Sequence, residues 1–248
     1  MHDATVRGLA QFDELAKVYP QLRLRPTLDE SLRISGELTF TAHPKVGGSL
    51  PRITDSYEVE IVVPALFPRS APVVRELGGR IPATFHTNPD GTLCLASPTR
   101  QKLVIACNPT LLAFVELLVV PYLYGHSYSL KHGRLPFGEL AHGVQGIRQD
   151  FQRIFRARDE EVAVTFVRLA ALKKWCANKC LCPCGSRRRL GKCHNRIVNR
   201  LRRLLGRRWF QEQYHLLNPS PSSISGSDKK GGTRTCPRGR RARAQRRA

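Results

Sequence analysis

Two pairs of metal-binding side chains stand close together in the segment CLCPCGSRRRLGKCH. Cys182 and Cys184 are separated by one residue, and Cys193 and His194 follow after eight more. Zinc is bound by four thiolate or imidazole ligands at tetrahedral corners, and two close pairs joined by a short hairpin supply that geometry. Free buried thiols are the alternative, but so small and basic a segment has no core of its own to bury them. The spacing therefore predicts one zinc ion held by these four residues.

One cysteine outside this cluster also has a position that could support chemistry. Cys94 follows the turn sequence Asn88-Pro-Asp90-Gly in FHTNPDGTLCLA, and His86 lies just before that turn. A thiol presented by a loop can act as a nucleophile, whereas a lone cysteine between two leucines is commonly a core residue. Both interpretations stay open on these residues alone. Asp90 is interpreted as turn chemistry, and Cys107 in VIACNP as a core residue.

The elements that must position Cys94 change their periodicity along the chain. Apolar residues at helical spacing predict a helix over residues 8–18, ended by Pro20. The alternating segments SLRISGELTF, SYEVEIVV and APVVREL then predict antiparallel strands with one solvent-facing side. The proline-rich bend PALFPRSAP precedes the third of them. The predicted order is a helix, a strand meander and a long loop that contains Cys94.

Helical periodicity returns after this loop. The segment TLLAFVELLVVPYLYGH, from Thr110, predicts a helix that is kinked or split at Pro121. Two more helices are expected in GIRQDFQRIFRA and EVAVTFVRLAALKK, and a basic amphipathic helix over residues 197–217 follows the cysteine cluster. The serine-, proline- and arginine-rich residues 218–248 cannot bury enough apolar surface to fold alone.

Targeting signals and membrane segments are not expected. The longest apolar run, around residues 111–124, is shorter than the about 20 residues that a membrane span needs. The N-terminal sequence lacks the layout of a secretory signal. Eight cysteines in a chain of this kind indicate a reducing, cytoplasmic compartment, where thiols serve as metal ligands or catalytic groups rather than disulfides.

Positive charge is concentrated toward the C-terminus. Residues 161–248 contain 23 of the 41 Lys and Arg residues but only 3 of the 19 Asp and Glu residues, so most of the net charge of +22 lies there. Such a segment favours a polyanionic partner. Non-specific binding to a nucleic acid, which weakens with salt, is one interpretation, because the tail has no aromatic residues to stack on bases. A solvated tail without a partner is an equal alternative.

The segment CPCGSRRRLGKCH resembles the zinc motif at the C-terminus of the SecA translocase (the SEC-C motif), in which CxC, eight residues and CH bind one zinc ion. Every ligand position matches, whereas Arg187 stands where the motif usually has glycine. Cys176 and Cys180 lie outside the pattern and are not assigned as ligands. The resemblance implies a zinc knot over residues 176–196.

The order of elements before Cys94 and the sequences SYEVEIVVPALFPRSAPVV and IPATFHTNPDGTLCLASP resemble the bacterial branch of the ubiquitin-conjugating enzymes. The resemblance implies an α+β fold built on an antiparallel meander with flanking helices. The expected organisation is a conjugating-enzyme-like domain (1–140), a helical extension (141–175), the zinc knot (176–196), the basic helix (197–217) and a disordered basic tail (218–248).

In that family a cysteine accepts the C-terminus of a ubiquitin-like protein as a thioester, and an amine then attacks the thioester. The resemblance implies that Cys94 is this nucleophile, that Asn88 donates a hydrogen bond to the oxyanion, and that His86 shapes the loop. The implied partners are an adenylating, activating enzyme and a ubiquitin-like protein. A role in anti-phage defence is a further implication of the resemblance.

Two other functions stay open. The sequence His-Thr-Asn stands where the family has His-Pro-Asn, and KLVIACNPTLL replaces the tryptophan-proline segment usual after the cysteine. These departures favour a scaffold with an inert cysteine that is recruited through its zinc knot. Alternatively, the chain is a zinc-containing nucleic-acid-binding adaptor whose first domain only dimerises or docks.

Overall fold

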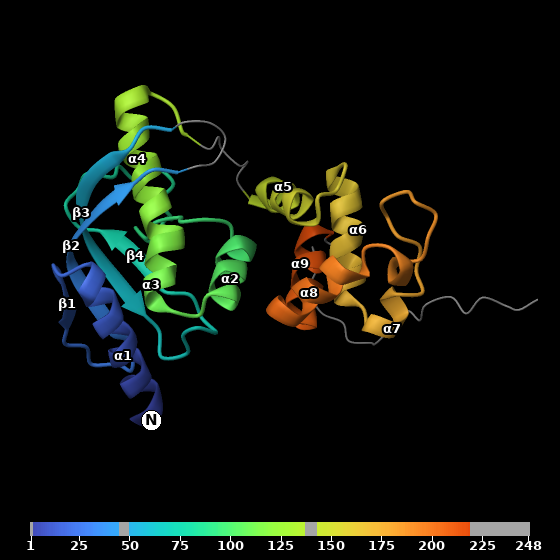
Figure 1. Cartoon of the computed structure of the whole chain (residues 1–248), viewed down its shortest axis with the longest axis horizontal. Helices are drawn as coiled ribbons and strands as arrows, with labels where there is room; N and C mark the ends of the chain where they lie inside the picture. Colours follow the sequence, from blue (N-terminus) through green and yellow to red (C-terminus); the bar gives the residue numbers. More distant parts are fainter. Residues whose placement is uncertain (1, 45–49, 137–142, 219–248) are drawn as a thin grey trace, which may run out of the picture.

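The computed structural model describes residues 2–44, 50–136 and 143–218, so the expected basic tail lies outside the described residues apart from its first position. Two bodies follow one another along the chain (Figure 1). We call them the N-terminal lobe, residues 2–136, and the C-terminal lobe, residues 143–218. The described residues form an α+β fold with one four-stranded antiparallel sheet. This part of the predicted fold class is confirmed.

The sheet is a meander whose strands lie in the order β1-β2-β3-β4. Apolar and polar residues alternate along its two long strands, so Ile34 and Ile61 pair across the sheet and are buried, whereas Glu58 is exposed. Alternation of this kind predicts every strand except the first. The strands are β1 (Leu22–Arg25), β2 (Leu32–Ala42), β3 (Ile53–Val63) and β4 (Val73–Glu76).

Helices cover the sheet (Figure 1). α1 (His2–Val18) packs against α3 (Leu111–Phe114), and α4 (Val120–His132) packs on β2 and β3. Tyr57 and Tyr124 lie fully buried in the core between these elements. The helix predicted over residues 8–18 is confirmed, and its backbone extends further toward the N-terminus.

A single helical stretch runs through Pro121, where a kink or split is expected. The backbone widens into a π-helical turn over Val115–Val119 immediately before the proline. Proline has no N–H, and its ring would clash with the carbonyl four residues earlier, so the wider turn accommodates it without ending the helix. The stretch Leu111–His132 has 22 residues and is the one described helix long and apolar enough to span a membrane, although a shorter run is expected. Its most apolar window is 72% buried inside the protein, as in the core helix of a soluble domain.

The C-terminal lobe is helical and has its own hydrophobic core. Phe155 stacks on Phe166 with a centroid separation of 5.1 Å, and Phe210 is buried beside them. Leu190 of the cysteine-rich hairpin belongs to the same core, so the hairpin is packed onto the helices. The elements are α5 (Gly143–Phe155), α6 (Glu160–Ala171), α7 (Lys174–Ala177), the 3₁₀ turn η2 (Leu190–Lys192), α8 (Asn195–Leu205) and α9 (Arg207–Leu217).

The basic amphipathic helix expected over residues 197–217 is two helices. α8 ends and α9 begins around Gly206, which adopts φ +83° and ψ 150°. This backbone conformation is essentially restricted to glycine and cannot continue a helix. Both helices nevertheless turn an apolar face to the core, as the amphipathic pattern predicts.

α2 (Pro98–Cys107) lies on the side of the N-terminal lobe that faces the C-terminal lobe (Figure 1), in a segment expected to be a loop. Ser97 caps its N-terminus. Ile105 is buried in the N-terminal core, whereas Leu103 packs against the C-terminal core. The expectation that Cys107 is a core residue is wrong, because it is the last residue of α2 and its side chain is exposed.

Candidate functional site

The four predicted metal ligands come together in the C-terminal lobe. One donor atom from each of Cys182, Cys184, Cys193 and His194 lies within 4.8 Å of all the others. His194 Nδ1 is 3.2 Å from Cys182 Sγ and 3.1 Å from Cys193 Sγ. The sulfurs of Cys184 and Cys193 are 3.6 Å apart. Because zinc–ligand bonds of about 2.0–2.3 Å place tetrahedral ligand atoms roughly 3.5 Å apart, the cluster has the dimensions of a four-coordinate metal site.

A tight hairpin brings the two ligand pairs together. The Cys182 N–H donates to Arg188 O at 2.8 Å, and Gly185 takes φ +83° at the turn between them. Gly191 passes so close to Asn178 that a Cβ atom would lie 3.0 Å from the Asn178 backbone oxygen. Both glycines therefore allow turns and approaches that a larger residue would strain.

Hydrogen-bond donors surround the sulfurs. The backbone N–H of Cys184 donates to the Cys182 sulfur. The Ser186 hydroxyl lies 3.3 Å, and the Arg188 guanidinium 3.8 Å, from the Cys193 sulfur. Burial raises the pKa of Cys182, whereas the hydrogen bond with Ser186 lowers the pKa of Cys184. Metal binding requires deprotonated thiols. These donors would therefore stabilise the negative charge of the thiolates that bind a metal ion.

The remaining contacts of the cluster fix its orientation. The Phe166 ring packs edge-on against the His194 ring at 5.4 Å, which limits rotation of the imidazole. Cys176 and Cys180 do not belong to the cluster. The Cys180 thiol instead donates to the Cys176 carbonyl at 3.5 Å. Their exclusion agrees with the prediction that they are not ligands.

Cys94 lies at the end of a small hairpin beside β4. Leu93 bridges to Thr87 across the turn and donates its N–H to Val74 O at 2.7 Å, which ties the hairpin to the sheet. The Cys94 N–H donates to His86 O at 2.7 Å. Leu93 is buried, whereas the Cys94 side chain is exposed. The backbone is thus fixed while the thiol faces solvent.

The turn before Cys94 is closed by side chains of the Asn-Pro-Asp-Gly sequence. Asp90 accepts hydrogen bonds from the N–H and the hydroxyl of Thr92 at 3.0 and 2.6 Å, so its expected role in turn formation is confirmed. Asn88 Nδ2 donates to Thr92 Oγ1 at 2.9 Å. Gly91 completes the turn with φ +79°. The side-chain amide of Asn88 is therefore hydrogen-bonded to Thr92 and not to Cys94.

The start of this hairpin is anchored to α4. The Tyr122 hydroxyl donates to Phe85 O at 2.9 Å and lies 3.3 Å from His86 O. The Phe85 ring packs against the His126 ring at 4.7 Å. His86 takes φ +40°, a left-handed conformation that is uncommon outside glycine. Through these contacts His86 holds the loop by its backbone, since its carbonyl accepts the Cys94 N–H.

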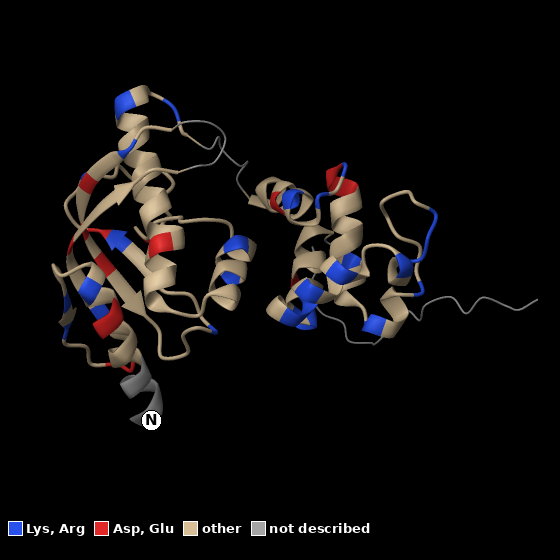
Figure 2. Ribbon diagram, viewed as in Figure 1, with Lys and Arg blue, Asp and Glu red and all other residues tan. Residues whose placement is uncertain are grey.

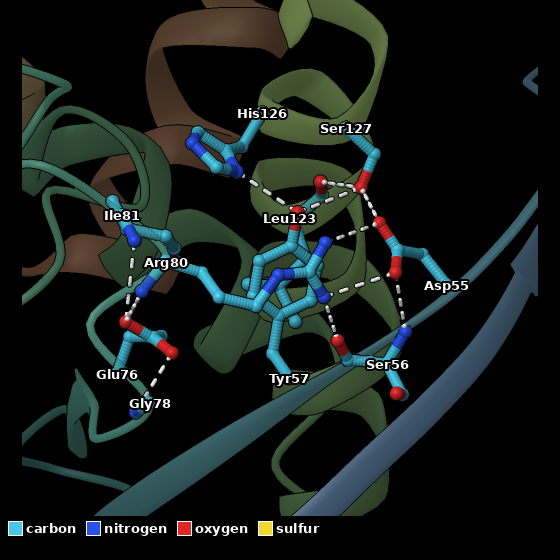
Figure 3. A network of polar contacts seen from close by, with 10 residues as sticks. All are labelled: Asp55, Ser56, Tyr57, Glu76, Gly78, Arg80, Ile81, Leu123, His126 and Ser127. Atoms are coloured by element: carbon cyan, nitrogen blue, oxygen red, sulfur yellow. Dashed lines mark hydrogen bonds and ion pairs between the residues drawn. The ribbon is translucent and has the colours of Figure 1, made fainter.

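A polar network joins α4 to β3 next to this anchor (Figure 3). The Tyr57 hydroxyl lies 2.8 Å from both His126 Nδ1 and Ser127 Oγ, and the Ser127 hydroxyl donates to Asp55 at 2.7 Å. Arg80 donates to Asp55 at 3.0 and 3.1 Å and covers the Tyr57 ring at 4.1 Å. Burial opposes ionisation of Asp55, but hydrogen bonds from Arg80 and Ser127 outweigh it and hold its pKa at about 2. The hairpin therefore adjoins a rigid frame.

The surroundings of Cys94 favour its neutral thiol. Although the side chain is exposed, partial desolvation of the sulfur raises the pKa of Cys94. Burial also raises the pKa of the neighbouring Tyr122 hydroxyl and lowers the pKa of His126. At neutral pH only a small fraction of Cys94 is therefore thiolate, and the thiol reacts slowly with ordinary electrophiles.

Comparison of the chain with protein-family models, curated proteins and solved structures found no match. The functional interpretation therefore depends on the geometry of this chain. Two features carry it: the four-ligand cluster of the C-terminal lobe and the exposed thiol of Cys94.

Three residues that the sequence does not single out contact the Cys94 region. Tyr122 anchors the start of the hairpin at Phe85, and Ser97 caps α2 while donating to Asp150 of α5. Ser97 has a visible signal, because a serine followed by proline is typical of a helix start. Tyr122 and Asp150 have none, since their partners lie 37 and 53 residues away in the sequence.

Proposed function

We propose that the chain is a ubiquitin-conjugating-type transferase in which Cys94 carries a ubiquitin-like protein as a thioester. The observation that supports this best is the exposed Cys94 thiol on a fixed hairpin beside β4, between an antiparallel meander and the helices that follow. A cysteine that only filled the core would be buried, as Leu93 is. The order of elements and the resemblance of the loop sequence support the same assignment.

Transfer onto Cys94 exchanges one thioester for another. The Cys94 sulfur loses its proton and attacks the carbonyl carbon of the modifier, which is bound as a thioester to the activating enzyme. The tetrahedral intermediate collapses, the bond to the activating enzyme's sulfur breaks, and that thiolate takes up a proton. An acceptor amine then attacks the new thioester, loses a proton, and releases Cys94 as the leaving thiolate. No oxidant or reductant is consumed.

Asn88 is the candidate donor to the oxyanion of both steps. Its amide nitrogen has two hydrogens, and the bond to Thr92 uses one of them. Loss of one preorganised oxyanion donor typically costs about 10²–10³ in rate. Because Asn88 is exposed on a surface turn, Asn88→Ala should lower acyl transfer by about tenfold to a hundredfold while leaving the fold intact.

We further propose that zinc is the metal of the C-terminal cluster. A Cys₃His set suits zinc and resembles the SEC-C motif. All four positions would be protein ligands, so the site would have no open position for a substrate. The metal would accordingly hold the hairpin on the core of the C-terminal lobe, to which Cys182 and Leu190 contribute.

The proposed transfer is tested by incubating the purified chain with a bacterial ubiquitin-like protein and its activating enzyme. After incubation with ATP, wild type should give an adduct that resists denaturant but is lost on treatment with a thiol. Cys107→Ser, which removes the other exposed cysteine of this lobe, should give the same adduct, and Cys94→Ala none. An adduct that persists in Cys94→Ala, or none in wild type while the activating enzyme is itself charged, would contradict the proposal.

A second function, binding to a nucleic-acid backbone, is favoured by the surface of α8. Residues 173–218 contain 13 Lys and Arg residues but one acidic residue, and Figure 2 shows Lys and Arg positions recurring along the ribbon of this lobe. Arg196, Arg200 and Arg203 recur at helical spacing on the exposed side of α8. Within the described chain none of these three forms an ion pair, whereas Arg33, for example, pairs with a carboxylate. Unpaired arginines in a row suit phosphates, which they can bind in a bidentate manner.

This second function is tested by fluorescence anisotropy with a labelled 20-base-pair DNA. Each phosphate contact contributes a slope of about 0.9 to the dependence of log affinity on log salt. Replacing the three α8 arginines by glutamine should reduce that slope by about 2–3 in a chain ending at residue 218, where the tail cannot compensate. An unchanged slope would contradict it. The matched control replaces three exposed arginines of the N-terminal lobe, Arg52, Arg69 and Arg134.

A further inference from the structure

α2 is shared by the two lobes and begins close to the candidate nucleophile. Its cap, Ser97, lies three residues after Cys94. One side of α2 enters the N-terminal core through Ile105, and Leu103 enters the C-terminal core. α5 and α8 of the C-terminal lobe both pack against α2. A shift of the C-terminal lobe would therefore move the helix that follows Cys94.

A direct polar contact joins α5 to the start of this helix. The Ser97 hydroxyl donates to Asp150 and accepts the N–H of Arg100 at 3.1 Å. Asp150 is only 2% exposed, and among the described residues the Ser97 hydroxyl is the hydrogen-bond donor to its side chain. Burial of a carboxyl group is costly unless it is hydrogen-bonded. An apolar side chain could fill the buried site of Asp150 without this cost. What Asp150 adds, and an apolar residue would not, is the hydrogen bond with Ser97.

The segment from the thiol to the cap is held at both ends. At one end the Cys94 N–H donates to His86 O at 2.7 Å. At the other, Gln101 of α2 donates its side-chain amide to Ala96 O at 2.8 Å and its N–H to Ser97 O at 3.0 Å. The first anchor belongs to the N-terminal lobe alone. Asp150 is the anchor that the C-terminal lobe adds.

We propose that Asp150 is a positioning residue for Cys94: through Ser97 it fixes the end of the segment 94–97 and so sets how the thiol is presented. That this positioning matters for acyl transfer rests on the proposed function. The contact between Asp150 and Ser97, and its effect on the reactivity of the thiol, do not. When the anchor is lost, the segment moves away from the protein surface. The sulfur is then less desolvated and reacts faster with small reagents, but it is held less well for a protein partner.

The test is the rate of alkylation of Cys94 by iodoacetamide at pH 7.5, in the full metal-loaded chain carrying Cys107→Ser. Ser97→Ala and Asp150→Leu should each raise the rate constant about threefold or more. The double variant should react no faster than Ser97→Ala alone, because Asp150 acts on the segment only through the Ser97 hydroxyl. Ser97→Thr keeps the hydroxyl, and Asp150→Asn keeps an acceptor oxygen. Both variants should therefore be alkylated at the same rate as the parent chain.

A control separates this role from general stability. Asp159 caps α6 in the same lobe by accepting the N–H of Val162 at 2.7 Å, so Asp159→Ala should lower the melting temperature without changing the alkylation rate. Unchanged rates in Ser97→Ala, or effects that add in the double variant, would overturn the proposal. If Asp150→Leu fails to fold, Asp150→Ala takes its place in the test, because Ser97→Ala also removes the hydrogen bond that caps α2. The alkylation assay contains no ubiquitin-like protein. Its outcome therefore does not depend on whether the chain carries out acyl transfer.

Discussion

The sulfur of Cys94 is reachable from solvent, and at neutral pH it is mostly protonated, because desolvation raises its pKa. This combination suits a carrier that receives an activated acyl group. Thioester exchange needs only a transient thiolate when a partner delivers an activated carbonyl. A thiol of this kind reacts slowly with oxidants and stray electrophiles, since those reagents act on the thiolate.

The raised pKa of Cys94 predicts the pH dependence of its alkylation. With Cys107→Ser as background and the metal site loaded, the iodoacetamide rate should rise about tenfold per pH unit from pH 7 to 8, because the thiolate fraction rises in that proportion below the pKa. The apparent pKa should exceed the about 8.5 of a free cysteine. A rate that levels off below pH 8 would show that the thiol is activated instead.

The ligand cluster predicts the metal content of the purified chain. Wild type should contain about one zinc per chain by elemental analysis, because the four donor atoms lie close enough together for tetrahedral coordination. Cys184→Ser combined with Cys193→Ser should reduce this to near zero. Cys176→Ser combined with Cys180→Ser alters two nearby thiols outside the cluster, so it should keep about one. Metal retained in the first pair, or lost in the second, would mean that the ligands are assigned wrongly.

At the scale of elements, periodicity predicts the long strands and most helices but misses β1 and α2. β1 has four residues between two prolines, too few to establish an alternation. α2 begins with the Ser97-Pro98 pair, a helix-start signal, but its apolar residues are divided between two cores and follow no single stripe. Gly206 likewise interrupts a pattern that otherwise reads as one helix. In each case the outcome depends on contacts or backbone angles that local pattern does not contain.

The backbone conformation of Gly206 leads to a prediction about stability. Its φ of +83° with ψ of 150° is accessible essentially to glycine alone, and a Cβ there would meet nothing within 4 Å. Gly206→Ala should therefore destabilise the chain by about 1–3 kcal/mol through backbone strain and not through a clash. Urea unfolding measures the change. Gly133 lies at the left-handed end of α4 with φ +67° and ψ 11°, so Gly133→Ala should lower the free energy of unfolding by less than Gly206→Ala does. An equal or larger loss at Gly133 would contradict the explanation by backbone strain.

At the scale of the whole molecule, two lobes with different charge meet through α2. The charge asymmetry of the sequence marks the C-terminal lobe, because its basic residues and the cysteine cluster occur together. The contact between the lobes is not visible in the sequence. It depends on pairs such as Lys102 and Trp209, whose ammonium and ring lie 4.4 Å apart across the junction.

Both tryptophans of the chain lie in the C-terminal lobe, at positions 175 and 209, which allows the lobes to be followed separately. Cys182 and Leu190 of the cysteine-rich hairpin belong to that lobe's core. If a metal ion is bound by the cluster, removing it should loosen this core, because metal binding and folding are coupled in small metal sites. A chelator should therefore shift tryptophan emission to longer wavelength. Hydrogen exchange in β2 and β3 should stay slow. Unchanged emission after the metal is gone would show that the core does not depend on it.

The central claim is that Cys94 carries an acyl group, and the intact mass of the chain under acidic, non-reducing conditions tests it most directly. After incubation with ATP, the activating enzyme and the ubiquitin-like protein, the mass should increase by that of the modifier less one water. Proteolysis should map the increase to the peptide that contains Cys94, and hydroxylamine should remove it. An unchanged mass while the activating enzyme carries the modifier, or an adduct that maps to another residue, would contradict the account.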